Sequence, residues 1–135
     1  MMTGQREAPP LSGGPPVLIM MKGHPGSGKS TLARALARAL RCPLVDKDDA
    51  RDCFQAHSAA AAAATGGGGD GAAAADGGGG GATGVDWNML SYEVMFQVAG
   101  TQLGLGLNVV ADCPLARARL FEDGVAVARR VSRRL

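Results

Sequence analysis

A chain of 135 residues has room for one domain, and its net charge of +2 at pH 7 singles out no class of partner. The apolar run at residues 17–21 is too short to span a membrane, and residues 1–16 carry no signal or transit pattern. Three cysteines without metal-ligand spacing suit reduced thiols: Cys42, Cys53 and Cys113. These features predict a cytoplasmic protein with no membrane partner.

Two segments have compositions that resist packing. Residues 1–16 are rich in proline and glycine, and residues 59–84 are almost wholly alanine and glycine. A segment without large apolar side chains buries too little surface to offset the backbone entropy lost on ordering. We therefore expect a disordered tail at 1–16 and one partial domain at 17–135, interrupted by a disordered Ala/Gly-rich insert at 59–84.

The first half of the domain predicts two strands and two helices. The continuous apolar run 17–21 is typical of a strand buried on both faces of a parallel sheet. Residues 29–40 predict a helix, 44–45 a second strand, and the following residues a helix to about residue 54. The apolar positions of the first helix fall on one predicted face: Leu32, Ala35, Leu36, Ala39 and Leu40.

The second half predicts a helix, a strand and a last helix. Asp86 is the expected N-cap of a helix from Trp87 to about residue 103, and a strand at 107–111 ends at Asp112. The last helix runs from residue 115 to about 134 and is expected to break or bend near Gly124. One apolar face is predicted for the first of these helices: Leu90, Val94, Val98 and Leu103. Strands that alternate with helices imply a parallel sheet with helices on its faces.

Arginines crowd the C-terminal end of the chain, where only Glu122 and Asp123 oppose them. They are Arg117, Arg119, Arg129, Arg130, Arg133 and Arg134. Such a cluster can meet phosphate or nucleic acid, but a solvated helix face is the interpretation that we favour.

Residues 23–30 match the phosphate-binding pattern G-x-x-x-x-G-K-[ST] at every defined position. Its glycines let the backbone turn tightly with N–H groups pointing inward, and the helix that follows adds its positive end. Lys29 is expected to reach the β- and γ-phosphates and Ser30 to ligate Mg²⁺. We take His24 as a variable loop position rather than a catalytic histidine. The expected contacts of the nucleoside triphosphate are Gly23, His24, Pro25, Gly26, Ser27, Gly28, Lys29, Ser30 and Thr31.

Acidic residues follow the second and third predicted strands, at the edge where open α/β sheets bind ligands. Asp48 or Asp49 can take or orient the proton of a hydroxyl, and Arg51 can hold a phosphate or steady the carboxylate. Alternatively, these aspartates serve as the N-cap of the next helix, or one of them caps it while the other acts on the hydroxyl. Asp112 follows an apolar run, which is the pattern of the second aspartate of a magnesium site. Alternatively, it only starts the turn before Pro114.

With these sites placed, the chain resembles the small P-loop kinases of the polynucleotide-kinase and zeta-toxin type, often grouped as AAA-like predicted kinases. The resemblance is carried by residues 23–31, 46–52 and 109–115, and it covers about 17–58 and 85–128. It implies a three-layer α/β P-loop NTPase sandwich with a parallel sheet, and ATP and Mg²⁺ as cofactors.

The same resemblance implies roles for individual residues. Asp48 matches the general base toward a substrate hydroxyl, Arg51 the substrate- or phosphate-binding arginine, and Asp112 the acid after the third strand. Asp48, Lys29 and Arg51 are thus the expected catalytic residues, and Ser30 and Asp112 the expected metal ligands.

Members of that family continue with a fourth strand, an arginine-bearing lid and a fifth strand, whereas this sequence ends at Leu135. We therefore expect a truncated chain with only the first three strands of the kinase core. The usual strand order, 2-3-1-4-5, leaves residues 17–21 as an apolar edge that a partner or a second copy can pair with. One hypothesis is a kinase that transfers the γ-phosphoryl group of ATP to a hydroxyl of a small molecule or of a nucleic-acid end. The alternative is a truncated module that binds nucleotide without turnover.

Overall fold

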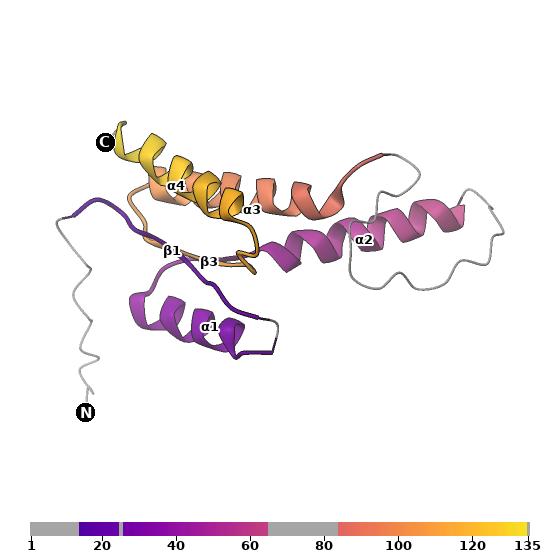
Figure 1. Ribbon diagram of the computed structural model, residues 1–135, viewed down its shortest axis with the longest axis horizontal. Helices are drawn as coiled ribbons and strands as arrows, with labels where there is room; N and C mark the ends of the chain where they lie inside the picture. Colours follow the sequence, from indigo (N-terminus) through magenta and orange to yellow (C-terminus); the bar gives the residue numbers. More distant parts are fainter. Residues whose placement is uncertain (1–13, 25, 65–83, 135) are drawn as a thin grey trace, which may run out of the picture.

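The computed structural model describes residues 14–24, 26–64 and 84–134, which form three parallel strands and four helices (Figure 1). The predictions for the N-terminal tail, for Pro25 and for most of the insert lie outside these described residues. The elements, in chain order, are β1 (Leu18–Met20), α1 (Lys29–Leu40), β2 (Leu44–Asp46), α2 (Lys47–Ala64), α3 (Trp87–Gly104), β3 (Val109–Asp112) and α4 (Ala118–Ser132).

The sheet has the strand order β1-β3-β2, and both pairs are parallel. β3 is the middle strand. All four of its residues, Val109–Asp112, are buried, as expected for a strand that is covered on both faces and paired at both edges. β1 lies at one edge, as the strand order of the family predicts. Its pairing with a partner stays a prediction.

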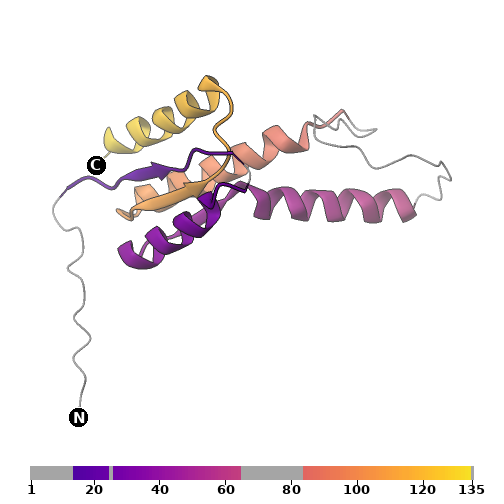
Figure 2. The ribbon, with the colours of Figure 1, turned by 60° about the horizontal axis from the view of Figure 1, so that its bottom comes forward.

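Helices cover both faces of the sheet and make the predicted three-layer α/β sandwich (Figures 1 and 2). On one face, Val109 and Ala111 pack into a core with α3 and α4. On the other face, Val110 packs against Ala33 of α1. The alternation follows from the strand period of two, which sends successive side chains to opposite faces. Among the described helices, none is long and apolar enough to cross a bilayer.

The buried face of α1 differs from the predicted one. Ala33 is the buried residue of the helix, whereas Leu32 is 55% exposed. The helix begins directly after the loop at Gly28, and this start fixes which positions face the sheet. A small side chain at position 33 lets α1 lie close to β3, so its apolar face is shifted by one residue from the prediction.

The buried face of α3 matches the predicted one only in part, since Leu103 is buried and Leu90 and Val94 are half-buried. Val98 is exposed, and the buried residues are Ser91, Tyr92, Met95, Phe96, Ala99 and Leu103. α3 contacts α2, α4 and the sheet, so apolar side chains are spread around it and its periodicity is ambiguous. The predicted N-cap is confirmed, since the Asp86 carboxylate accepts a hydrogen bond of 3.0 Å from the Met89 N–H.

α2 continues to Ala64 and therefore includes the first alanines of the insert. Alanine has the highest helix propensity, so a helix that has already begun extends through an alanine run without needing tertiary contacts. Figure 2 shows the far end of α2 projecting away from the three layers. Composition alone did not distinguish this helical part from the glycine-rich remainder.

α4 runs without a break through Gly124, contrary to the predicted interruption. This glycine is buried, and a Cβ there would overlap the Met20 sulfur and lie 3.1 Å from Cε1 of Phe96. Gly124 therefore serves close packing of α4 against β1 and α3 rather than a bend.

Replacing Gly124 with alanine is expected to lower the free energy of unfolding by about 1–3 kcal/mol, because the added methyl overpacks the core. Gly104 ends α3 and has open space where a Cβ would stand, so Gly104→Ala is the matched control. The control should leave stability unchanged or raise it by up to about 1 kcal/mol. Urea unfolding followed by circular dichroism measures both, and equal stabilities for the two variants would contradict the packing role.

Candidate functional site

The loop between β1 and α1 contains glycines at positions where any other residue would be strained. Gly26 and Gly28 have φ angles of +79° and +81°, a region that L side chains rarely adopt. A Cβ at Gly23 would come within 2.9 Å of the Ser27 hydroxyl oxygen. The Ser27 N–H donates to the His24 carbonyl over 3.2 Å and closes the turn. The spacing of the phosphate-binding pattern thus produces a tight loop.

The N-terminus of α1 is left without a protein cap. Gly28 is the N-cap and supplies no side chain, and the first turn holds no acidic residue. The first N–H groups of a helix lack intrahelical partners and carry partial positive charge, which makes an uncapped start suited to an anion. Ser30 and Thr31 are exposed on this turn, and His24 is exposed in the loop before it.

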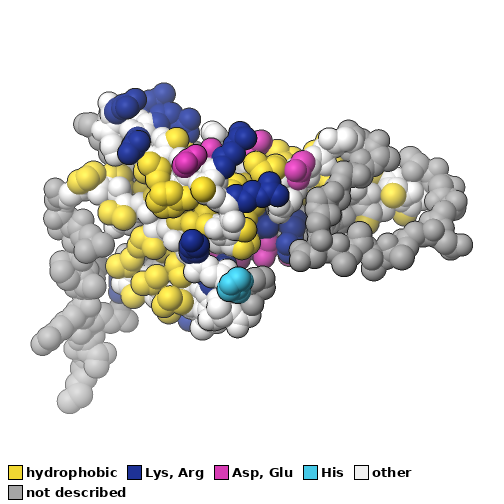
Figure 3. All heavy atoms as spheres, in the orientation of Figure 1, with side chains coloured by type: hydrophobic (Ala, Val, Ile, Leu, Met, Phe, Trp, Pro, Cys, Tyr) yellow, Lys and Arg dark blue, Asp and Glu magenta, His cyan; other side chains and the backbone are white. Residues whose placement is uncertain are grey.

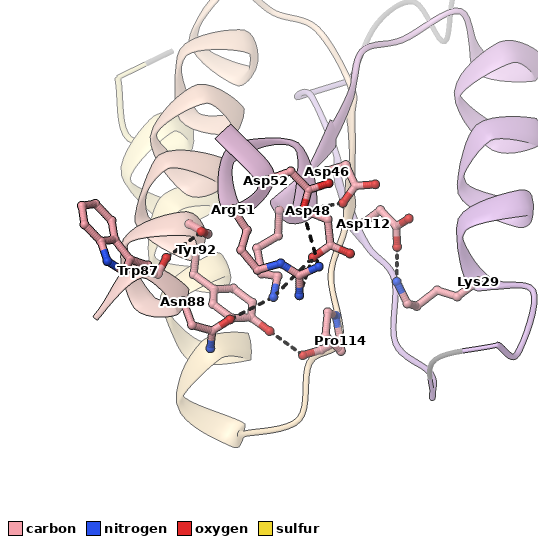
Figure 4. A network of polar contacts seen from close by, with 12 residues as sticks. Lys29, Asp46, Asp48, Arg51, Asp52, Trp87, Asn88, Tyr92, Asp112 and Pro114 are labelled. Atoms are coloured by element: carbon pink, nitrogen blue, oxygen red, sulfur yellow. Dashed lines mark hydrogen bonds and ion pairs between the residues drawn. The ribbon is translucent and has the colours of Figure 1, made fainter. Parts of the chain in front are cut away.

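Lys29 and Asp112, two residues singled out in the sequence, are in contact (Figure 4). The Lys29 ammonium donates to Oδ1 of Asp112 and forms an ion pair with it. The aspartate side chain is 1% exposed and the lysine side chain 12%. Because β1 and β3 are parallel neighbours, the end of β3 lies beside the start of α1. The Lys29–Asp112 ion pair therefore lies at the carboxyl edge of the sheet.

The second oxygen of Asp112 fits a metal site. Oδ2 is buried and has no hydrogen-bond partner, which is uncommon for a buried carboxylate oxygen. Mg²⁺ prefers oxygen ligands and is commonly held by one or two carboxylates together with phosphate oxygens and water. Within the described residues no group of three or more His, Cys, Asp and Glu side chains could hold a metal ion. The unpartnered oxygen of Asp112 has the donor chemistry for a magnesium ion whose other ligands come from a triphosphate and water.

Asp46 is a site residue that the sequence interpretation missed. It ends β2 directly beside Asp112 in the sheet register, and its Oδ1 accepts a 2.8 Å hydrogen bond from the Asp48 N–H. Burial raises the pKa of Asp46, the hydrogen bond from that N–H opposes the rise, and the charges of Asp112, Asp48 and Asp49 add to it. The signal was present, because Asp46 ends its strand just as Asp112 does.

This hydrogen bond also settles which residue caps α2. Asp46 caps the helix, so the interpretation in which Asp48 or Asp49 is the cap is wrong. Both of those aspartates lie in the first turn, where negative charge favours the helix.

Asp48 lies between two cations at this edge of the sheet. Its Oδ1 is 3.4 Å from Nη1 of Arg51, three residues on, and 3.5 Å from the Lys47 ammonium. The carboxylate side chain is nevertheless 49% exposed, so one side of it faces solvent. The predicted pairing of Asp48 with Arg51 in helical register is confirmed.

Lys47 is a second residue that the sequence did not single out. It is buried, its ammonium donates to Oδ1 of Asn88 over 3.0 Å, and it lies 5.0 Å from the centroid of the Tyr92 ring. The Tyr92 hydroxyl donates in turn to the Pro114 carbonyl over 2.8 Å, and burial raises the pKa of this tyrosine to about 12 (Figure 4). The network ties the first turn of α2 to α3 and to the loop after β3, and it holds Asp48 in place.

The cysteine beside Asp112 is a core residue. Cys113 is buried, and burial raises the pKa of its thiol to about 11, so it stays protonated at neutral pH. Cys42 is half-buried and Cys53 is exposed. Cys113 therefore contributes packing rather than a thiolate to this edge.

These features define a class of protein. A parallel sheet, a glycine-rich loop between β1 and α1, and a lysine that reaches the acid at the end of the central strand make a P-loop NTPase fold of the kinase-like kind. Residues 18–135 match the family model described as an AAA domain, and the chain belongs to that family.

Two similar proteins carry kinase in their names. A stretch of 32 residues, 24% of this chain, is 53% identical to the shikimate kinase of Corynebacterium efficiens, and it spans only 19% of that enzyme. The crystal structure of a presumed kinase from Chloroflexus aurantiacus superposes with a TM-score of 0.60 at 21% identity, over 87% of this chain and 54% of the other. The second likeness shows the fold, and the chain spans about half of that structure's length.

Proposed function

We propose that the protein binds ATP with Mg²⁺ at residues 23–31 and transfers the γ-phosphoryl group to a hydroxyl group. The observation that carries the proposal is the placement of Asp48. Its carboxylate is half exposed beside Arg51 at the sheet edge that also holds Lys29 and Asp112. A potential base and a phosphate-binding loop at one edge suit phosphoryl transfer, which depends on positioning and charge stabilisation.

Toward the nucleotide, the chain supplies hydrogen-bond donors for the phosphate oxygens. N–H groups at the uncapped start of α1 would hold phosphate oxygens, and Lys29 would exchange Asp112 for the β- and γ-phosphates. Ser30 and Asp112 would hold Mg²⁺, directly or through water. When bound, the ion neutralises charge on the phosphates.

On the acceptor side, Asp48 would take the proton of the attacking hydroxyl. A bond forms between that oxygen and the γ-phosphorus, the bond from the γ-phosphorus to the bridging oxygen breaks, and ADP leaves with the electron pair. Arg51 would steady the carboxylate or hold the phosphoryl group, since its Nε is buried without a hydrogen-bond partner. Lys47 fixes the start of α2 through Asn88.

The acceptor is proposed only as a class. The resemblance to polynucleotide-kinase and zeta-toxin-like proteins, together with the short match to a shikimate kinase, favours a hydroxyl of a small molecule or of a nucleic-acid end. The match to the AAA domain family supports a nucleotide substrate without naming the acceptor.

A transfer assay tests this function. The full chain is incubated with γ-labelled ATP, Mg²⁺ and a panel of 5′-hydroxyl oligonucleotides, sugars and hydroxy acids, and labelled products are separated. We expect labelled product with one acceptor class, and its formation should be about 1,000-fold slower in the Asp48→Asn variant. Intact ATP binding without transfer to any acceptor would reject the kinase and favour the alternative, a module that binds nucleotide without turnover.

A further inference from the structure

A groove of about 560 Å³ lies between the C-terminal halves of α3 and α4. Gln97, Thr101 and Gly104 line it from α3, Arg130 lines it from α4, and Arg134 lines it from just beyond the end of α4. Because Gly104 carries no side chain and a Cβ there would meet nothing within 4 Å, the groove is open at this point. None of the described lining residues is acidic.

The groove lies far from the phosphate loop. α3 ends just before β3 begins, so this end of α3 lies at the amino edge of the sheet, whereas the phosphate loop follows the carboxyl end of β1. Figure 1 shows the end of α4 and the start of α1 at opposite ends of the layers. The proposed phosphoryl transfer therefore uses neither Arg130 nor Arg134.

The positive charge here is concentrated and not neutralised. Figure 3 shows Lys and Arg side chains gathered over the C-terminal end of α4. In the part of the chain that the structure describes, the ion pairs involve other residues, and no carboxylate pairs with Arg130 or Arg134. Arg129 and Arg133 extend the charge onto the next face of the helix, beside β1.

We propose that this groove binds the phosphate backbone of a nucleic-acid strand. Four arginines on two faces at the C-terminal end of α4 suit an extended polyanion better than a single compact anion. Arginine together with threonine and glutamine side chains is a usual donor set for nucleic-acid phosphates. The groove is polar and lacks the aromatic and methionine anchors of protein interfaces, which favours nucleic acid over an acidic protein.

Fluorescence anisotropy with a labelled single-stranded DNA oligonucleotide and the full chain tests the proposal. Arg130→Gln/Arg134→Gln should weaken binding about 10-fold and flatten the slope of log affinity against log salt by about 1.4, or 0.7 for each lost phosphate contact. The control, Arg34→Gln/Arg38→Gln, removes the same charge from exposed positions of α1 and should leave affinity within about 2-fold of wild type.

A second pair of variants tests the groove without removing an arginine. Gly104→Glu places a carboxylate in the open space and should weaken binding as the arginine variant does, whereas Gly104→Ala should not. The Lys29→Met/Asp112→Asn variant, in which no buried charge is left unpaired, should bind the oligonucleotide as wild type does, which separates this site from the phosphate loop. Three results would overturn the proposal: no binding at low salt, an equal loss in the α1 control, or equally effective competition by polyglutamate.

Discussion

Replacing Lys29 with methionine is expected to lower the affinity for Mg-ATP by about 100-fold. The side chain is the cation of the phosphate-binding pattern, and a hydrogen bond to a charged group contributes about 1.5–3 kcal/mol. In the free protein the ammonium is paired with Asp112, so nucleotide binding exchanges one anionic partner for another. Arg34→Met removes an exposed cation from the same helix and should bind as wild type does.

The same substitution is expected to cost stability, which needs a separate control. Lys29→Met leaves the buried Asp112 carboxylate without its cation, and breaking a buried pair in this way costs about 3 kcal/mol. In the double variant Lys29→Met/Asp112→Asn no uncompensated charge remains, so the free energy of unfolding should largely recover. Nucleotide binding should not recover. Recovery of both, or normal ATP binding in the single variant, would contradict the role of Lys29.

Replacing Asp48 with asparagine is expected to slow phosphoryl transfer by about 1,000-fold, within the range lost when a general base is removed. Binding of Mg-ATP should be unchanged, because Asp48 belongs to α2 and not to the phosphate loop. The helix should still form, since the cap is Asp46. Single-turnover measurements of labelled product give the rate, and calorimetry gives the affinity.

Asp49→Asn is the matched control for this prediction. Asp49 is the next residue in the same turn and is exposed, and its loss changes the net charge by the same amount. Its transfer rate should stay within about 3-fold of wild type, since surface substitutions usually have small effects. A rate that falls equally in both variants would assign the effect to the charge of the helix start rather than to catalysis by Asp48.

Local patterns predicted the elements of this fold well. The helix after the phosphate loop begins and ends as expected, because the pattern fixes its start and Pro43 follows its end. The central strand and its aspartate were found because an apolar run followed by a polar residue is a local signal. The order of the strands came from the family resemblance.

Packing was less predictable than element position. Leu32 is exposed although leucine usually marks a buried face, because the close approach of α1 to the sheet selects Ala33 instead. Gly124 looked like a helix break, but its role depends on Met20 and Phe96, which are distant in the sequence. Such contacts form only when the layers pack together, so the sequence of one helix does not indicate them.

In the candidate site, too, local patterns predicted the positions of residues but not their contacts. Lys29 and Asp112 were named from separate patterns, and the fold brings them together. Lys47 escaped notice because its partner Asn88 lies across the Ala/Gly-rich insert, and a lysine before two aspartates indicates only a polar helix start. The polar network behind Asp48 therefore required the structure.

Calorimetry with Mg-ATP and with adenosine tests whether the loop at residues 23–30 binds the phosphates of a nucleotide. We expect one binding site for Mg-ATP, no measurable binding of adenosine, and loss of the Mg-ATP signal in the Lys29→Met/Asp112→Asn variant. Equal binding of adenosine and ATP, or an unchanged signal in that folded variant, would show that the triphosphate is not held by this loop.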